Sequence, residues 1–225
     1  MITLIGILAV AVLSALNPIE QVNKAKDASK SADSSQMVNA LDRYFASNLV
    51  WPWTRYTTNQ LNNDSGFGAP VYYQGVGVCA AELDPDGNPD LATHEAAYPA
   101  NGTSGCAQNG LLISSEELKD QFAKRSYFKS GTGNDELLYV QKLVNNNSVS
   151  VCYKPASKAT RDLYSANPSR LKKLTLALDA NGVYVPGTTA ADKEECTSGP
   201  GGTQPNLDWA SLDPNKWCFI CIPDQ

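Results

Sequence analysis

Six cysteines are the residues of this chain best suited to covalent chemistry, and structural disulfides are their expected use. An acidic chain with this many cysteines is typical of an oxidising compartment outside the cytoplasm. Six cysteines allow fifteen pairings, and sequence does not choose among them. We favour Cys79 with Cys106, because this pair would close the most loop-rich region of the chain. The disulfide candidates are Cys79, Cys106, Cys152, Cys196, Cys218 and Cys221.

The spacing of the cysteines disfavours two other uses. Cys218 and Cys221 have the two-residue separation of a thioredoxin-type motif, which needs a helix that starts at the first cysteine and lowers its pKa. Only four residues follow Cys221, which is too few for such a helix. A zinc site would need a second closely spaced pair of ligands, and the sequence has none.

An acidic stretch offers a second kind of chemistry. Residues 84–90 read DPDGNPD, which places oxygen-bearing side chains at alternate positions. Calcium binds six to eight oxygens and accepts such loops, although the glycine is not where an EF-hand has it. The same residue types make ordinary turns, and a bare turn is the favoured interpretation. We therefore expect no cofactor, with calcium as the alternative. Its ligands would be Asp84, Asp86, Asn88 and Asp90.

The sequence does not indicate an enzyme. His94 is the only histidine and lies in a polar stretch, which is typical of a solvated residue rather than a catalytic base. No phosphate-binding glycine motif is present. The formal net charge of −5 argues against a nucleic-acid partner, unless basic residues gather locally, for example around Lys119, Lys124 and Arg125.

An uncharged apolar run opens the chain, from Ile2 to Leu16. At helical rise it spans about 23 Å, which is short for a hydrocarbon core of roughly 30 Å. A signal peptide, a buried core helix and a membrane helix lacking its first residues are the three interpretations. We favour the membrane helix because of the segment that follows. Its residues would include Ile5, Gly6, Ile7, Leu8, Val10, Val12, Leu13, Leu16 and Pro18.

The next segment has the pattern of an amphipathic helix. Residues 20–45 contain neither Gly nor Pro, and their apolar positions are mostly three or four apart. We expect one helix to continue through Pro18, which would kink it, and one apolar stripe to pack against the rest of the protein. That stripe consists of Val22, Ala25, Ala28, Ala32, Val38, Leu41 and Phe45.

The remainder, residues 51–225, reads as a loop-rich head with short strands. The Trp51 and Trp53 pair is expected to pack in its core. We predict a strand within 71–78, helices over 112–123 and 158–164, and a last strand over 217–222. Hairpins are predicted at 136–153 and 174–185. The fold class is α+β: a long N-terminal helix, hydrophobic and then amphipathic, packed against an antiparallel sheet with loop-rich insertions.

The first 45–55 residues resemble the N-terminal helix of type IV pilins and type II secretion pseudopilins. On this resemblance, residues 1–50 are the membrane anchor and filament core, and 51–225 are a disulfide-containing pilin head. The family's basic leader and cleavage glycine have no counterpart here, and we expect them upstream of Met1. The matching residues are Gly6, Ile7, Leu8, Ala9, Leu16, Asn17, Pro18, Ala25, Asp27, Ala28, Ala40, Leu41 and Tyr44.

The resemblance implies a structural function. The chain would be a subunit of a type IV pilus or pilus-like filament that polymerises through its N-terminal helix and displays its head outside the cell. Its partners would be other copies of itself or other pilins, the pilus assembly machinery, and the bacterial inner membrane before assembly. A secretion-system pseudopilin is the alternative within the family. A membrane-tethered adhesin or binding domain that does not polymerise is the alternative from another class.

Overall fold

A computed structural model describes residues 17–55, 62–80, 101–102, 105–106, 108–129, 131–166, 170–173, 194–195 and 218–223. The apolar run before Asn17 lies outside the described residues, as do the acidic stretch 84–90, His94, Cys196 and the hairpin expected at 174–185.

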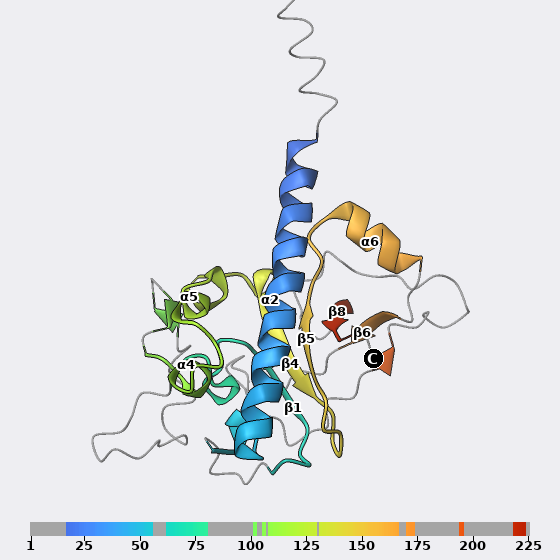
Figure 1. The fold of residues 1–225 in the computed structure, drawn as a ribbon. Coiled ribbons are helices and arrows are strands. Elements are labelled where there is room, and N and C mark those ends of the chain that lie inside the picture. The colour runs from blue at the N-terminus through green and yellow to red at the C-terminus, as the bar shows by residue number, and fades with distance from the viewer. Residues whose placement is uncertain are drawn as a thin grey trace, which may run out of the picture.

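One long helix, α2 (Pro18–Asn48), dominates the fold (Figure 1). Asn17 has extended backbone angles, and its side chain accepts a hydrogen bond from the N–H of Glu20. Pro18 is the first helical residue, where its missing N–H costs nothing. Pro18 therefore stands at the start of α2 rather than inside it, and the residues that a kink or loosening at Pro18 would join to α2 lie outside the described part of the chain. At the other end, Leu49 adopts a left-handed conformation (φ 59°) and closes the helix.

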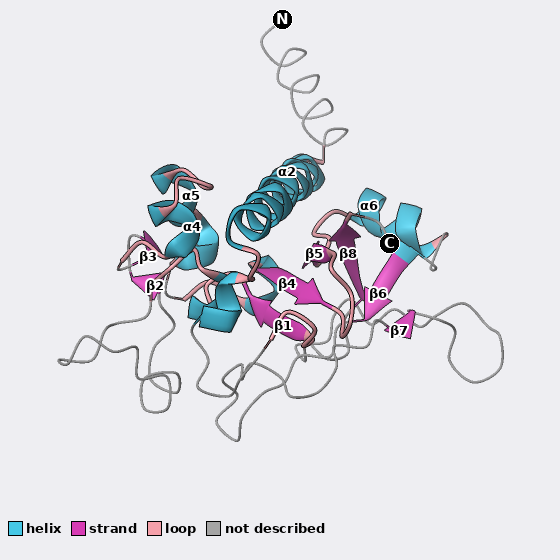
Figure 2. Ribbon diagram, turned by 60° about the horizontal axis from the view of Figure 1, so that its bottom comes forward, coloured by secondary structure: helices cyan, strands magenta, loops and turns pink. Residues whose placement is uncertain are grey.

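The helix lies against an antiparallel sheet, so the α+β prediction is confirmed at this level (Figure 2). Within the described residues, the strand order is β1-β4-β5-β8-β6-β7, and every neighbouring pair is antiparallel. The strands are β1 (Phe67–Pro70), β4 (Leu138–Lys142), β5 (Val149–Tyr153), β6 (Leu171–Lys173), β7 (Glu194–Glu195) and β8 (Cys218–Ile222). A separate small pairing joins β2 (Asn101–Gly102) to β3 (Gly105–Cys106).

Short helices flank α2 on two sides. The views in Figures 1 and 2 agree that α4 and α5 lie on one side of α2 and α6 on the other. The helix predicted over 158–164 is present as α6, which Ser157 caps, but the helix predicted over 112–123 is broken, because Glu116 adopts φ 62°. These helices are α4 (Leu111–Ser114), α5 (Asp120–Ala123) and α6 (Lys158–Ser165). Four 3₁₀ turns complete the described elements: η1 (Pro52–Arg55), η2 (Gln74–Val76), η3 (Ser126–Phe128) and η4 (Asn134–Glu136).

The strand predictions are confirmed for the hairpin over 136–153 and for the last strand over 217–222. β4 and β5 form the expected hairpin, with Asn145 left-handed (φ 56°) in the turn, and β8 is the expected last strand. The strand expected within 71–78 is wrong, since β1 precedes that segment and ends at Pro70. After β1 the chain turns at Tyr73, whose N–H bonds the carbonyl of Pro70, and continues as η2.

The core lies between α2 and the sheet, and a stack of four aromatic rings forms one end of it. Phe45 stacks on Trp51 with ring centroids 4.3 Å apart. Trp51 stacks on Trp53 at 5.1 Å, and Trp53 on Phe67 at 4.3 Å, all with nearly parallel planes. Trp51 and Trp53 are both fully buried, which confirms their expected role in the core.

Candidate functional site

An exposed set of apolar and small residues lies on the N-terminal half of α2. It is formed by the exposed residues Ile19, Val22, Ala25, Ala28 and Ala32, and we call it the outer face. Ile19 and Val22 are 72% and 56% exposed, although both are large and apolar. Figure 1 shows this half of α2 extending past the sheet. An exposed apolar strip on a long helix is typical of a surface that contacts another molecule.

The packing prediction for α2 is right only in the C-terminal half of the helix. Val38 and Leu41 are buried and Phe45 is half-buried against the core. The other four members, Val22, Ala25, Ala28 and Ala32, are exposed, so the prediction is wrong for them. The reason is that the N-terminal half of α2 buries polar residues instead. Those residues are Asp27, Lys30, Asp33 and Ser34.

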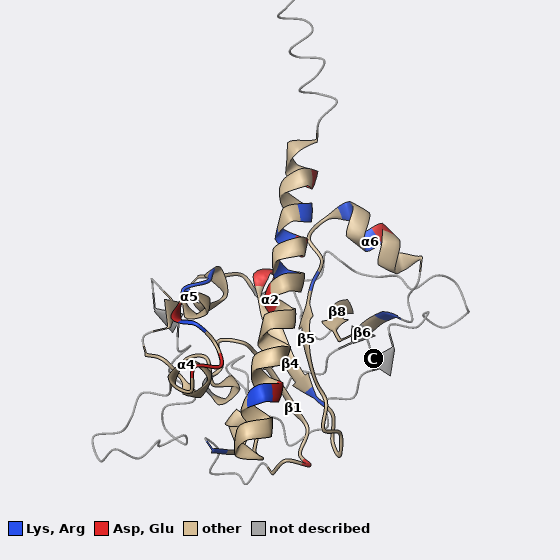
Figure 3. Ribbon diagram, in the orientation of Figure 1, with Lys and Arg blue, Asp and Glu red and all other residues tan. Residues whose placement is uncertain are grey.

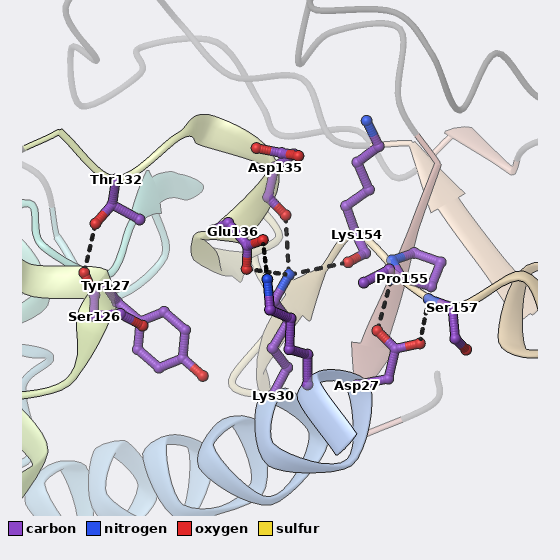
Figure 4. Close-up of polar contacts among 12 residues, drawn as sticks. Asp27, Lys30, Ser126, Tyr127, Thr132, Asp135, Glu136, Lys154, Pro155 and Ser157 are labelled. Carbon is purple, nitrogen blue, oxygen red and sulfur yellow. Dashed lines mark hydrogen bonds and ion pairs between the residues drawn. The ribbon is translucent and has the colours of Figure 1, made fainter. Parts of the chain in front are cut away.

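Three of these buried polar residues, Asp27, Lys30 and Asp33, follow one another at three-residue spacing along α2. Figure 4 shows Asp27 and Lys30 with their partners. We call these three residues the polar seam. Each of its members contacts a different segment of the head, as the next three paragraphs describe. Burying a charged group is costly unless it is paired or hydrogen-bonded, so the seam's partners decide whether α2 is held to the head.

Asp27 holds the segment that leads from β5 into α6. Its carboxylate accepts the backbone N–H of Ala156 at 2.6 Å and that of Ser157 at 2.9 Å. About two turns earlier on α2, Glu20 accepts the N–H groups of Lys158 and Ala159 at 3.0 and 2.8 Å. These N–H groups lie in the first turn of α6 and have no partner within that helix, and a negative charge is favourable at a helix N-terminus. The same two bonds lower the pKa of Glu20 below its usual value.

Lys30 contacts the turn before β4. It is 3% exposed, and its ammonium group donates to the carbonyls of Asp135 at 2.9 Å and Lys154 at 3.4 Å. Burial lowers the pKa of Lys30, against the opposing effect of Glu136, whose carboxylate lies 3.7 Å away. Lys26 binds the same carboxylate at 2.9 Å. Burial tends to raise the pKa of Glu136, but the two lysines lower it overall.

Asp33 fixes the opposite side of α2 to η3. The hydroxyl of Tyr127 donates to one carboxylate oxygen at 3.0 Å, and Arg125 lies 3.1 Å from the other. Burial, together with the negative charge of Asp33, raises the pKa of Tyr127 well above its usual value. Farther along α2, Arg43 forms an ion pair with Glu117 at 2.8 Å. The polar seam therefore fastens α2 to the head, through Asp27 at the start of α6 and through Asp33 at η3. Ile19 and Val22 lie about three turns before Lys30 and Asp33 on the same side of α2, nearer its N-terminal end.

Two disulfides stiffen the head that α2 is fastened to. Cys79 is bonded to Cys106, as the sequence suggested, and Cys152 is bonded to Cys221. The second bond joins directly opposite residues of β5 and β8, the strands next to α2. Cys218 is also disulfide-bonded, and none of the described cysteines is a free thiol.

Neither the metal site nor the membrane helix predicted from the sequence lies within the described residues. Where side chains are described, no group of three or more His, Cys, Asp or Glu residues could hold a metal ion. Asp84, Asp86, Asn88 and Asp90 lie outside that part of the chain, as do the membrane-helix residues before Pro18. Among the helices the structure describes, none has the length and apolar character needed to span a bilayer.

The polar seam could not be read from the sequence. Its charged residues occupy positions that the helical pattern placed beside an apolar stripe, and their partners lie up to 130 residues away. The sequence held one weak indication that the apolar stripe does not pack against the head: the alanines of the outer face are small and have little apolar area to bury. No family model matches this chain, and no curated protein or solved structure matches it significantly.

Proposed function

We propose that this chain is a structural subunit of a type IV pilus or a similar filament, and that its copies associate through the outer face of α2 and the apolar residues before it. One observation carries the proposal: Ile19 and Val22 are exposed near the N-terminal end of a long helix whose following turns are fastened to the head. A lone monomer gains nothing from exposing these side chains. A neighbouring subunit would cover them.

The side chains of the outer face suit helix-to-helix contact. Ala25, Ala28 and Ala32 are small, and small residues let two helices approach closely. The apolar run from Ile2 to Leu16 would extend the same contact surface and would reside in the inner membrane before assembly. Because one subunit would use different surfaces toward its two neighbours, the assembly would be open and head-to-tail.

The polar seam has a separate role in this proposal. A filament needs every head at the same angle to its helix, and Asp27, Lys30 and Asp33 supply directional contacts on both sides of α2. An apolar contact alone would permit sliding, since it is non-directional. The head would then be displayed outside the cell, where its disulfides persist.

An assembly assay on the full chain tests the proposal. Purified protein is transferred from detergent into buffer, and polymers are collected by sedimentation and imaged by electron microscopy. Val22→Glu and Ala28→Glu, both at exposed positions, are expected to leave the fold intact and to abolish polymers. Asn147→Glu, at the exposed β4–β5 turn, is the matched control and should assemble normally. Normal assembly of both α2 variants would contradict the proposal.

The same assay distinguishes the two alternatives. A membrane-tethered adhesin predicts that even the unmodified chain stays monomeric. A secretion-system pseudopilin predicts short fibres, and we associate it with a calcium requirement of the acidic stretch 84–90. A melting temperature that calcium leaves unchanged would remove the calcium interpretation.

A further inference from the structure

A basic pocket lies beside α2, one turn beyond Ala32 at the end of the outer face. It is a partly open surface depression with a volume of about 430 Å³. Its lining combines three cations, two side-chain amides and one aromatic ring. The lining residues are Gln36, Lys119, Gln121, Phe122, Lys124 and Arg125. Figure 3 shows basic positions on both sides of α5 in a chain whose formal net charge is −5.

The charges of this pocket are unbalanced in favour of an anion. Lys119 and Lys124 are exposed, and neither has an ion-pair partner among the described residues. Arg125 is held by Asp33 at 3.1 Å, so its position at the pocket is fixed. Asp120 lies next in sequence to Lys119 and accepts a hydrogen bond from the side-chain amide of Asn109 at 3.1 Å; its negative charge offsets part of the basic charge and leaves a net positive lining. Two free cations and one positioned guanidinium therefore face the pocket.

The number and arrangement of these groups decide the class of anion. A nucleic acid is bound by many cations along its backbone, and two free lysines would neutralise too few phosphates for useful affinity. A single small anion would leave the amides of Gln36 and Gln121 unused. Amides both donate and accept hydrogen bonds, as sugar hydroxyls require, and the ring of Phe122 forms an apolar base. We propose that the pocket binds an acidic saccharide, with the lysines on its carboxylate or sulfate group and the amides on its hydroxyls.

This proposal does not depend on filament assembly, because the pocket belongs to one chain. The probe is a short oligomer of galacturonic acid, titrated by calorimetry into the full chain in a nonionic detergent. Its methyl ester, which has the same sugar and no charge, is the matched ligand control. Inorganic phosphate and a short DNA duplex are the competing anions. We expect the acid oligomer to bind and the ester to bind at least tenfold more weakly.

Three variants locate the binding. Lys119→Gln combined with Lys124→Gln should weaken the acid oligomer at least tenfold, whereas Lys158→Gln, at an exposed lysine of α6, should change nothing. Gln121→Ala should weaken the oligomer by roughly threefold to tenfold, the effect of one hydrogen bond, and leave any phosphate binding unchanged. All of these side chains are exposed, and unchanged melting curves will confirm that the variants fold.

Several results would overturn the assignment. Equal binding of the ester and the acid would show that charge is not used. Unchanged affinity in the double lysine variant would place the binding elsewhere. Tighter binding of phosphate or DNA than of the oligomer, or an unchanged affinity in Gln121→Ala, would replace the saccharide by a simple anion or a nucleic acid.

Discussion

Asp27 and Ser157 are 130 residues apart in the chain, yet the carboxylate of Asp27 accepts the backbone N–H of Ser157 at 2.9 Å. Asp27 is 5% exposed, so this bond is made away from water. It joins the N-terminal half of α2 to the start of α6, a place where the apolar pattern of the helix predicted no contact. The attachment of the helix to the head is thus partly polar, and it can be tested residue by residue.

Replacing Asp27 should destabilise the protein strongly. Asp27→Ala removes the acceptor of two buried N–H groups, those of Ala156 and Ser157, and should lower the free energy of unfolding by about 2–4 kcal/mol. Asp162→Ala, at an exposed position of α6, is the matched control and should change stability by less than about 0.5 kcal/mol. Urea denaturation measures both. An equal, small effect of the two substitutions would show that the Asp27 contact does not hold the helix.

The contacts of α2 should also weaken in acid. The pKa values of Glu20 and Glu136 lie below their usual 4.5 in the folded protein. A carboxyl group with a lowered folded pKa contributes stability that is complete above its unfolded pKa and is lost as the pH falls through the folded value. We therefore expect the free energy of unfolding to fall as the pH drops below about 4.5.

The Glu136→Gln variant isolates this effect. It lacks the titrating carboxylate that Lys26 and Lys30 share, so its stability should be lower at neutral pH and should decline less in acid. Urea denaturation between pH 7 and pH 3 measures both slopes. Parallel curves for the variant and the unmodified protein would mean that Glu136 does not contribute to the acid dependence.

Much of the head could be predicted because its signals are local. The side chain of Ser157 caps α6 by accepting the N–H of Thr160, three residues later. The asparagine-rich turn at 145–147 joins β4 and β5 into a hairpin. The Cys79–Cys106 bond could also be favoured, because it closes the most loop-rich region of the chain. The pairing of Cys152 with Cys221 could not be chosen, since it requires knowing that β5 lies beside β8. The buried polar residues in the N-terminal half of α2 were missed for the same reason, because their partners are distant in sequence.

Removing the two disulfides should reveal a difference in their contributions. Cys152–Cys221 closes a loop of 69 residues, and Cys79–Cys106 closes one of 27. The loop-closure estimate gives roughly 4.4 kcal/mol for the longer loop and roughly 3.5 kcal/mol for the shorter. Paired substitutions to alanine, compared by urea denaturation, should therefore cost more at Cys152 and Cys221. The reverse order would show that contacts around the bonds outweigh the loop lengths.

The aromatic stack should account for a large share of core stability. Trp53 is fully buried between Trp51 and Phe67, and Trp53→Ala should cost about 3–5 kcal/mol. Trp53→Phe should cost less than half of that, because the indole N–H has no hydrogen-bond partner among the described residues. Thermal and urea denaturation measure both. A similar loss in the two variants would mean that the indole N–H, rather than ring packing, is the important group.

Site-specific photo-crosslinking tests the central claim, association through the outer face of α2, most directly. A photoreactive amino acid replaces Ala25 in the middle of that face, and in the control it replaces Asn147 at the β4–β5 turn. After illumination of the assembled full chain, the Ala25 position should yield crosslinked dimers and higher multimers, and mass spectrometry should locate the bond on another copy of α2 or the apolar run before it. Equal crosslinking at Ala25 and Asn147, or only intramolecular products at Ala25, would contradict the account.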